Sequence, residues 1–372
     1  ASNDKLGNRT HADAYQAIRE HGDVTEFSAD VLVLKYAQRS HGADRAVSRV
    51  LQRHGIETSR MQPCDGEAFV LSTEGALPAT RVLFLGTPHL RKLGYDRLRE
   101  FGAEALRILK HEGNVRHIAA TIHGPGYGLD ESEATLALVS GLLMGVRLGA
   151  CPPELERISL VERKESRVEL IRSTLADALA KAPHVHQEGT IFTVGHRTGV
   201  AQEHAEGDPP SPGEEGPQAP DLIASPIFGQ GSDIKPHAFV AMPFTQSFED
   251  VYFYGIRPPI KDAGMLSERI DQEVFSGDIF GRIKERIETA DLVVAELTGA
   301  NPNVYLELGY AWGKGRPTIL LSRSVEDLRF DVQGQRVLLY NSIRQLEARL
   351  RQELRTLVAR GILKDHMPNQ AR

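Results

Sequence analysis

The sequence predicts an α/β protein of two domains, each with a sheet between two layers of helices. Three observations lead to this prediction. Short apolar runs of strand type alternate with helical patterns of ten or more residues along most of the chain. A stretch rich in proline, glycine and acid interrupts this alternation at residues 198–236. The length of 372 residues allows two domains that each bury a core.

The elements before the interruption follow the order expected for a mainly parallel, helix-covered sheet. Residues 30–37 contain the apolar run VLVLKY, which predicts a buried strand. Residues 81–86 form a second such run, and residues 115–122 lead into a glycine-rich loop. The predicted strands are 30–37, 67–73, 81–86, 115–122 and 158–163, and the predicted helices are 43–54, 95–112, 131–148 and 165–181.

The alternation after the interruption is more regular and predicts a flavodoxin-like, doubly wound parallel sheet. Isoleucines recur at four-residue spacing from Ile279 to Ile287, which predicts an amphipathic helix. The proline pair at Pro258 should kink or divide the helix before it. The predicted strands are 237–242, 266–271, 291–297, 317–322 and 336–341, and the predicted helices are 248–263, 278–289, one that begins at 301, and 343–359.

These patterns divide the chain into two domains, residues 1–197 and 237–372, joined by a flexible acidic linker at 198–236. The linker composition buries too little apolar surface to offset the entropy of ordering it. We therefore expect the linker to leave the two halves free to move.

Bulk properties exclude several classes of protein. The formal net charge of −6 argues against a nucleic-acid surface, which needs a clustered basic face. The most apolar run, residues 134–146, is too short to cross a bilayer. Cys64 and Cys151 lack metal-type spacing and are too few for a disulfide framework. We expect a cytoplasmic protein with no metal, no nucleic-acid partner and no membrane partner.

Polar residues gather where the strands of the second domain end, and ligands of such sheets bind at the carboxyl ends of the strands. Residues 242–244 follow the first predicted strand, Arg269 and Asp271 close the second, and residues 298–303 follow the third. The predicted substrate-binding residues are Met242, Pro243, Phe244, Arg269, Asp271, Thr298, Asn301 and Asn303.

Two carboxylates at the same edge are the candidate catalytic groups. Asn301 should cap a helix that places Glu307 in its second turn, where a carboxylate could attack an anomeric carbon. Asp278 opens the preceding helix and could orient Glu307 or the sugar. The alternatives are a solvated helix glutamate for Glu307 and a simple N-cap for Asp278.

A glycine-rich loop in the first domain is a second candidate site. Gly124, Gly126 and Gly128 precede Asp130 and a predicted helix, so their N–H groups could bind a phosphate. The alternative is a tight turn between a strand and a helix. These four residues are the predicted ligand-binding residues of the N-terminal domain.

Residues 290–321, ADLVVAELTGANPNVYLELGYAWGKGRPTILL, and the upstream HAFVAMPF at 237–244 resemble the nucleoside 2-deoxyribosyltransferase-like superfamily, which is akin to TIR domains. The resemblance implies a nucleophilic role for Glu307 and a positioning role for Asp278. Nucleoside transferases often have an aspartate where this chain has Asn301, which favours hydrolysis over transfer. Many TIR domains cleave NAD, so NAD is the expected substrate, with no cofactor required. TIR-like effectors commonly act as oligomers, so we expect a homo-oligomer in the active state.

The first half resembles the macro-like N-terminal domain found ahead of leucyl aminopeptidases, through ADVLVLKY at 29–36, GEAFVLST at 66–73 and RVLFLG at 81–86. Such folds often bind ADP-ribose and related nucleotides. Together the two resemblances imply an NAD hydrolase or other nucleotide N-glycosidase that a nucleotide-derived activator controls, as in bacterial antiphage defence. The alternatives are a non-catalytic nucleotide-binding signalling module and an ADP-ribosyl or deoxyribosyl transferase.

Overall fold

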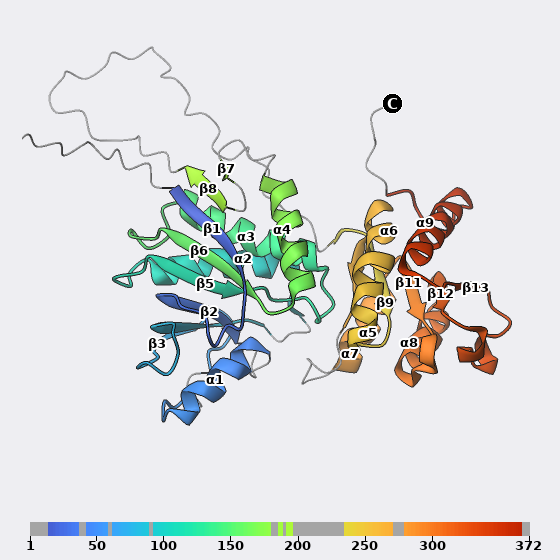
Figure 1. The fold of residues 1–372 in the computed structure, drawn as a ribbon, viewed down its shortest axis with the longest axis horizontal. Helices are drawn as coiled ribbons and strands as arrows, with labels where there is room; N and C mark the ends of the chain where they lie inside the picture. Colours follow the sequence, from blue (N-terminus) through green and yellow to red (C-terminus); the bar gives the residue numbers. More distant parts are fainter. Residues whose placement is uncertain are drawn as a thin grey trace, which may run out of the picture.

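The computed structural model of the chain describes residues 14–36, 42–58, 62–88, 92–179, 185–188, 191–195, 234–270 and 279–366 (Figure 1). It contains an eight-stranded sheet in the N-terminal half and a five-stranded sheet in the C-terminal half. Helices lie on both faces of each sheet. The predicted fold class, two α/β domains, is confirmed. Asp271, Asp278 and nearly all of the predicted linker lie outside the described residues.

The N-terminal sheet has the strand order β3-β4-β2-β5-β6-β1-β8-β7. Its five central strands, from β4 to β1, are parallel, as predicted. Strands β3, β8 and β7 pair antiparallel with their neighbours. The strands are β1 Ala14–His21, β2 Val31–Tyr36, β3 Ala68–Ser72, β4 Arg81–Gly86, β5 His117–Thr121, β6 Arg157–Glu162, β7 Val185–Glu188 and β8 Ile191–Gly195. The helices are α1 Ala43–Arg53, α2 Tyr95–Leu109, α3 Glu131–Arg147 and α4 Glu165–Leu179.

Sequence reasoning missed β1, β7 and β8. Strand β7 reads VHQE and has one apolar residue, and β1 reads AYQAIREH with charged residues in its second half. Such short, polar segments give no apolar period, and pairing with neighbouring strands decides their conformation. The other predicted elements of this half are present, with small differences at their ends.

The C-terminal sheet is wholly parallel, with the order β10-β9-β11-β12-β13. In chain order this is 2-1-3-4-5, the flavodoxin-like arrangement that the sequence predicts. The strands are β9 His237–Ala241, β10 Leu266–Glu268, β11 Leu292–Glu296, β12 Thr318–Ser322 and β13 Val337–Leu339. The helical elements are α5 Gln246–Asp250, η3 Val251–Ile256, α6 Arg257–Asp262, α7 Ile279–Thr289, η4 Thr298–Ala300, α8 Pro302–Gly313, η5 Val325–Asp327, η6 Phe330–Val332 and α9 Ile343–Ala359.

The helix predicted at 248–263 is divided, as its proline pair requires. A π-helical segment, η3, separates α5 from α6, and Pro258 lies in the first turn of α6. Proline has no N–H for the hydrogen bond of a regular turn, so the chain widens the turn before it. The division places Tyr252 and Phe253 of η3 in the core beside β9, where they are 1% and 6% exposed.

The two halves share a hydrophobic core. One continuous cluster joins Leu93, Tyr95 and Leu129 of the N-terminal half to Phe239 and Ile283 of the C-terminal half. All five side chains are almost fully buried. Separating the two halves would expose this cluster to water, which favours the packed arrangement.

Candidate functional site

The topology of the C-terminal sheet has its switch point between β9 and β11. From β9 the chain continues to β10 on one side of this point. From β11 it continues to β12 and β13 on the other side. Ligands of open α/β sheets bind outside the carboxyl ends of the strands at such a point. The loops that flank it are residues 242–244 after β9 and residues 297–301 after β11. Six of the predicted substrate-binding residues lie on these two loops or on the first turn of α8: Met242, Pro243, Phe244, Thr298, Asn301 and Asn303.

The helix that carries Glu307 begins at this edge. The Asn301 side chain accepts a hydrogen bond from the Asn303 N–H at 2.9 Å and caps α8, and Pro302 occupies its first turn. Glu307 lies in the second turn and is 8% exposed. It is on the same side of the helix as Val304 and Leu308, which pack into the shared core. The structure thus places a buried carboxylate on a mainly apolar helix face close to the switch point.

The loop before α8 is strained. Gly299 has φ 75° and Ala300 has φ 50°, and a left-handed conformation is unfavourable for a residue with a β-carbon. The surroundings of the loop hold it in place, and Glu296 is the centre of those contacts.

Glu296, at the end of β11, is fully buried and was missed by the sequence reasoning. Its carboxylate accepts hydrogen bonds from the Thr298 N–H at 3.0 Å, from the Thr298 hydroxyl, and from the Tyr340 hydroxyl at 2.9 Å. Thr298 Oγ1 in turn accepts the Arg323 N–H at 2.9 Å. Burial raises the pKa of Glu296 above its usual value, and the hydrogen bonds only partly oppose the rise. A glutamate at the end of the apolar run LVVAE was the available signal.

Arg269 lies directly after β10, at the sheet edge where the sequence predicts it, and its side chain already has protein partners. It is 4% exposed, and its guanidinium lies 3.9 Å from the centroid of the Tyr252 ring and 5.1 Å from that of Phe244. It also donates to Glu249 at 3.2 Å. Arg269 therefore supports Phe244, the predicted wall of the base pocket, from behind, and its charge is already paired.

The glycine loop of the N-terminal half contacts the C-terminal half. Gly124, Gly126 and Gly128 all have positive φ values, of 102°, 83° and 88°. The Gly128 N–H donates to the Arg269 carbonyl at 3.2 Å, and Gly126 and Tyr127 form β-bridges with Ile270. Strand β10 ends at Glu268, where its pairing with β9 ends. In this structure the N–H of Gly128 is paired with protein and does not face a phosphate.

Asp130 acts as a helix cap at the contact between the halves. Its fully buried carboxylate accepts the N–H groups of Ser132 and Glu133, each at 3.0 Å, and that of Ser267 at 3.2 Å. Burial alone would raise the pKa of Asp130, but Arg257 and these hydrogen bonds hold it below its usual value. These partners occupy the carboxylate that the sequence predicted to bind a ligand.

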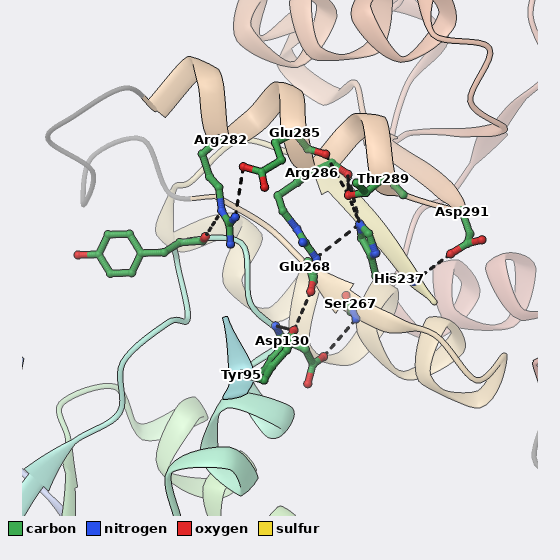
Figure 2. A network of polar contacts seen from close by, with 12 residues as sticks. Tyr95, Asp130, His237, Ser267, Glu268, Arg282, Glu285, Arg286, Thr289 and Asp291 are labelled. Atoms are coloured by element: carbon green, nitrogen blue, oxygen red, sulfur yellow. Dashed lines mark hydrogen bonds and ion pairs between the residues drawn. The ribbon is translucent and has the colours of Figure 1, made fainter. Parts of the chain in front are cut away.

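Glu268 is the centre of the polar contacts between the halves. Figure 2 shows it between Arg286 of α7 and Tyr95 of α2. The Tyr95 hydroxyl donates to Glu268 at 2.6 Å and accepts the Asp130 N–H at 2.8 Å, and Arg286 Nε donates to Glu268 at 2.8 Å. Burial and the nearby Glu268 raise the pKa of Tyr95 far above its usual value, so the hydroxyl keeps the proton that it donates.

A buried cation lies beneath the glycine loop. Lys35, on β2, is 3% exposed, and its Nζ is 3.6 Å from Asp44 and 5.3 Å from the centroid of the Tyr127 ring. Within the described part of the chain, neither Lys35 Nζ nor His123 Nε2 has a hydrogen-bond partner. Burial and the nearby Lys35 lower the pKa of His123 well below its usual value, so its imidazole is neutral.

No cluster of potential metal ligands occurs among the described residues. None of their helices combines the length and apolar character needed to cross a membrane.

Comparisons with known proteins find similarity only at the level of solved structures. No protein-family model matches the sequence, and no curated protein does. The N-terminal part is similar to macrodomains in fold. The Oceanobacillus iheyensis macrodomain with ADP is 16% identical, covers 44% of this chain and 91% of its own, and gives a TM-score of 0.36. The Trypanosoma brucei macrodomain in complex with ADP is 22% identical, covers 43% of this chain and 68% of its own, and gives a TM-score of 0.37.

Proposed function

We propose that the C-terminal unit is a nucleotide N-glycosidase that hydrolyses NAD, with Glu307 as the nucleophile. The observation that carries this proposal is the buried position of Glu307, in the second turn of the capped helix α8 beside the topological switch point. A carboxylate that is shielded from water by an apolar helix face is a stronger nucleophile toward a cationic sugar carbon than a hydrated one.

The reaction has two steps in this proposal. A Glu307 oxygen bonds to ribosyl C1 as the C1–N bond breaks, and the electron pair of that bond leaves with nicotinamide. Nicotinamide departs as a neutral base, so this step needs no general acid. Water then adds to C1, the ester bond breaks, and the products are ADP-ribose, nicotinamide and one proton, with the Glu307 carboxylate restored.

The remaining residues of the site have supporting roles in this proposal. Phe244, held by Arg269, forms one wall for the base. Asn301 fixes the start of α8 and thereby the position of Glu307. Asp278 keeps the positioning role that the family resemblance implies. The N-terminal unit binds a nucleotide-derived activator, for which ADP-ribose is the probe, and the protein acts in the cytoplasm as a homo-oligomer in antiphage defence.

The proposal is tested by measuring nicotinamide release from NAD with the full-length chain, with and without ADP-ribose and cyclic nucleotides. Glu307→Gln keeps the shape of the side chain and should reduce the rate by at least about 10³-fold, as removal of a nucleophile does. Glu326→Gln, an exposed change in the same unit, is the matched control and should leave the rate unaltered. Equal rates for wild type and Glu307→Gln on NAD and on a panel of nucleosides would contradict the enzymatic assignment.

A further inference from the structure

The end of β10 docks onto the glycine loop of the other half of the molecule. The Arg269 carbonyl accepts the Gly128 N–H at 3.2 Å, and Ile270 bridges Gly126 and Tyr127. Ile270 is 3% exposed, and a β-carbon at Gly128 would lie 3.2 Å from its side chain. The C-terminal unit therefore occupies the surface that the sequence predicts for a phosphate.

The groups beneath this loop point to a second partner. Among the described residues, Lys35 Nζ and His123 Nε2 are buried without a hydrogen-bond partner, and the ion-pair partner of Lys35, Asp44, lies at 3.6 Å, beyond hydrogen-bond distance. A buried donor that lacks an acceptor is destabilising, and native structures contain few such groups. Tyr127, from the loop itself, covers the Lys35 ammonium at 5.3 Å. A phosphate that entered here would give Lys35 an acceptor, but Tyr127 and its neighbours would have to move.

We propose that the docking of Arg269 and Ile270 on the glycine loop is an autoinhibitory contact that competes with a phosphate-bearing nucleotide for that loop and for Lys35. The inference rests on the proposed binding of a nucleotide by the N-terminal unit. In the docked state, Arg269 and Ile270 at the end of β10 occupy the glycine loop and exclude the nucleotide from it. In the bound state the phosphate contacts Lys35 and the loop N–H groups, and the β10 end is released.

The same contact reaches the candidate active site. The Arg269 carbonyl accepts the Gly128 N–H. The Arg269 guanidinium donates to Glu249 and lies over the Phe244 ring. Release of the Arg269 backbone would therefore free the wall of the base pocket. Because coupling between two sites is reciprocal, whatever weakens the docked state must strengthen nucleotide binding.

The experiment is calorimetric titration of the full-length chain with ADP-ribose. Ile270→Ala removes most of the docking side chain and should tighten binding by at least about fivefold, within the usual range of coupling between sites. Ile270→Val makes a smaller change, should give a smaller effect in the same direction, and is available if the alanine variant unfolds. Ile362→Ala, at a residue that is 45% exposed, is the control.

A second variant tests the cation. Lys35→Met combined with Asp44→Asn removes both members of the buried ion pair, so that no unpaired charge remains. It should weaken ADP-ribose binding by about tenfold or more, since a charged hydrogen bond to phosphate is lost. Unchanged affinity in this variant would overturn the assignment of Lys35.

The outcomes separate this inference from the proposed function. Tighter binding in Ile270→Ala without any cleavage of NAD would uphold the competition and contradict the catalytic role of Glu307. NAD cleavage that depends on Glu307, with equal ADP-ribose affinity in wild type and both Ile270 variants, would overturn the competition alone. Absence of ADP-ribose binding in every variant would also overturn it.

Discussion

Glu296 shows how one buried side chain can organise the edge of a sheet. Its carboxylate connects β11 to Tyr340, at the end of β13, and through Thr298 to Arg323, at the end of β12. The loop that it holds contains the left-handed Ala300 and leads directly to the cap of α8. The position of Glu307 therefore depends on a residue that does not belong to its helix.

The raised pKa of Glu296 predicts a pH effect on stability. A carboxyl group with a raised folded-state pKa contributes stability that is present below its unfolded pKa and lost as pH rises through the folded value. Glu296→Gln does not titrate, so its free energy of unfolding relative to wild type should increase as pH rises from about 4 toward neutrality. Urea unfolding of both proteins across this range measures the difference.

A difference between the two proteins that stays constant with pH would contradict this prediction. Tyr340→Phe removes one hydrogen bond but no titrating carboxyl group. The difference between its free energy of unfolding and that of wild type should therefore change less with pH.

Individual site residues differ in how far the sequence predicts them. Asn301 and Glu307 could be placed because both belong to one helix, whose spacing fixes their relation. Glu296 could not, because its partner Tyr340 is 44 residues away in the sequence. The contacts of Arg269 with Tyr252 and Glu249 could not be predicted, because nothing in the local sequence shows them.

The N-terminus of α8 is the element on which the proposed catalysis depends. Asn301→Ala removes the cap of the Asn303 N–H and should lower the free energy of unfolding by about 1 kcal/mol. Asn301→Ser retains a capping oxygen, so its free energy of unfolding should fall by only a small part of this amount. Chemical denaturation of the three proteins tests this, and equal stability of the alanine variant and wild type would show that the cap contributes nothing.

The helices were predictable because each packs one face on a sheet and so has an apolar period, and the buried strands because both their faces are covered and so form continuous apolar runs. The antiparallel strands β7 and β8 were not. Strand β8 depends on pairing with β1, far away in the sequence, and β7 pairs with β8. The early end of β10 was also unpredictable. Strand β10 ends where its pairing with β9 ends, and the Arg269 carbonyl that follows accepts the N–H of Gly128 from the other half.

The two halves should unfold together, because one hydrophobic cluster belongs to both. Tyr95→Phe removes the hydroxyl that joins Glu268 and the Asp130 N–H, and leaves both buried groups with one partner fewer. We expect a loss of about 1–3 kcal/mol in the free energy of unfolding. Tyr254→Phe, at a residue that is 54% exposed, is the control and should change little.

Calorimetry distinguishes the possibilities for the whole molecule. A single transition that shifts to lower temperature in Tyr95→Phe is the expected result. Two separate transitions, with only one affected by the substitution, would show that the halves are independent despite their contact.

The cluster shared by the halves also affects how the protein is made. A ribosome releases the chain from its N-terminus, so Leu93, Tyr95 and Leu129 exist before any residue of β9 or α7 has been synthesised. Until β9 and α7 have been synthesised, these apolar side chains face water or a chaperone. The nascent N-terminal half should therefore bind chaperones. Expressed as a separate polypeptide, it should expose an apolar surface that promotes aggregation.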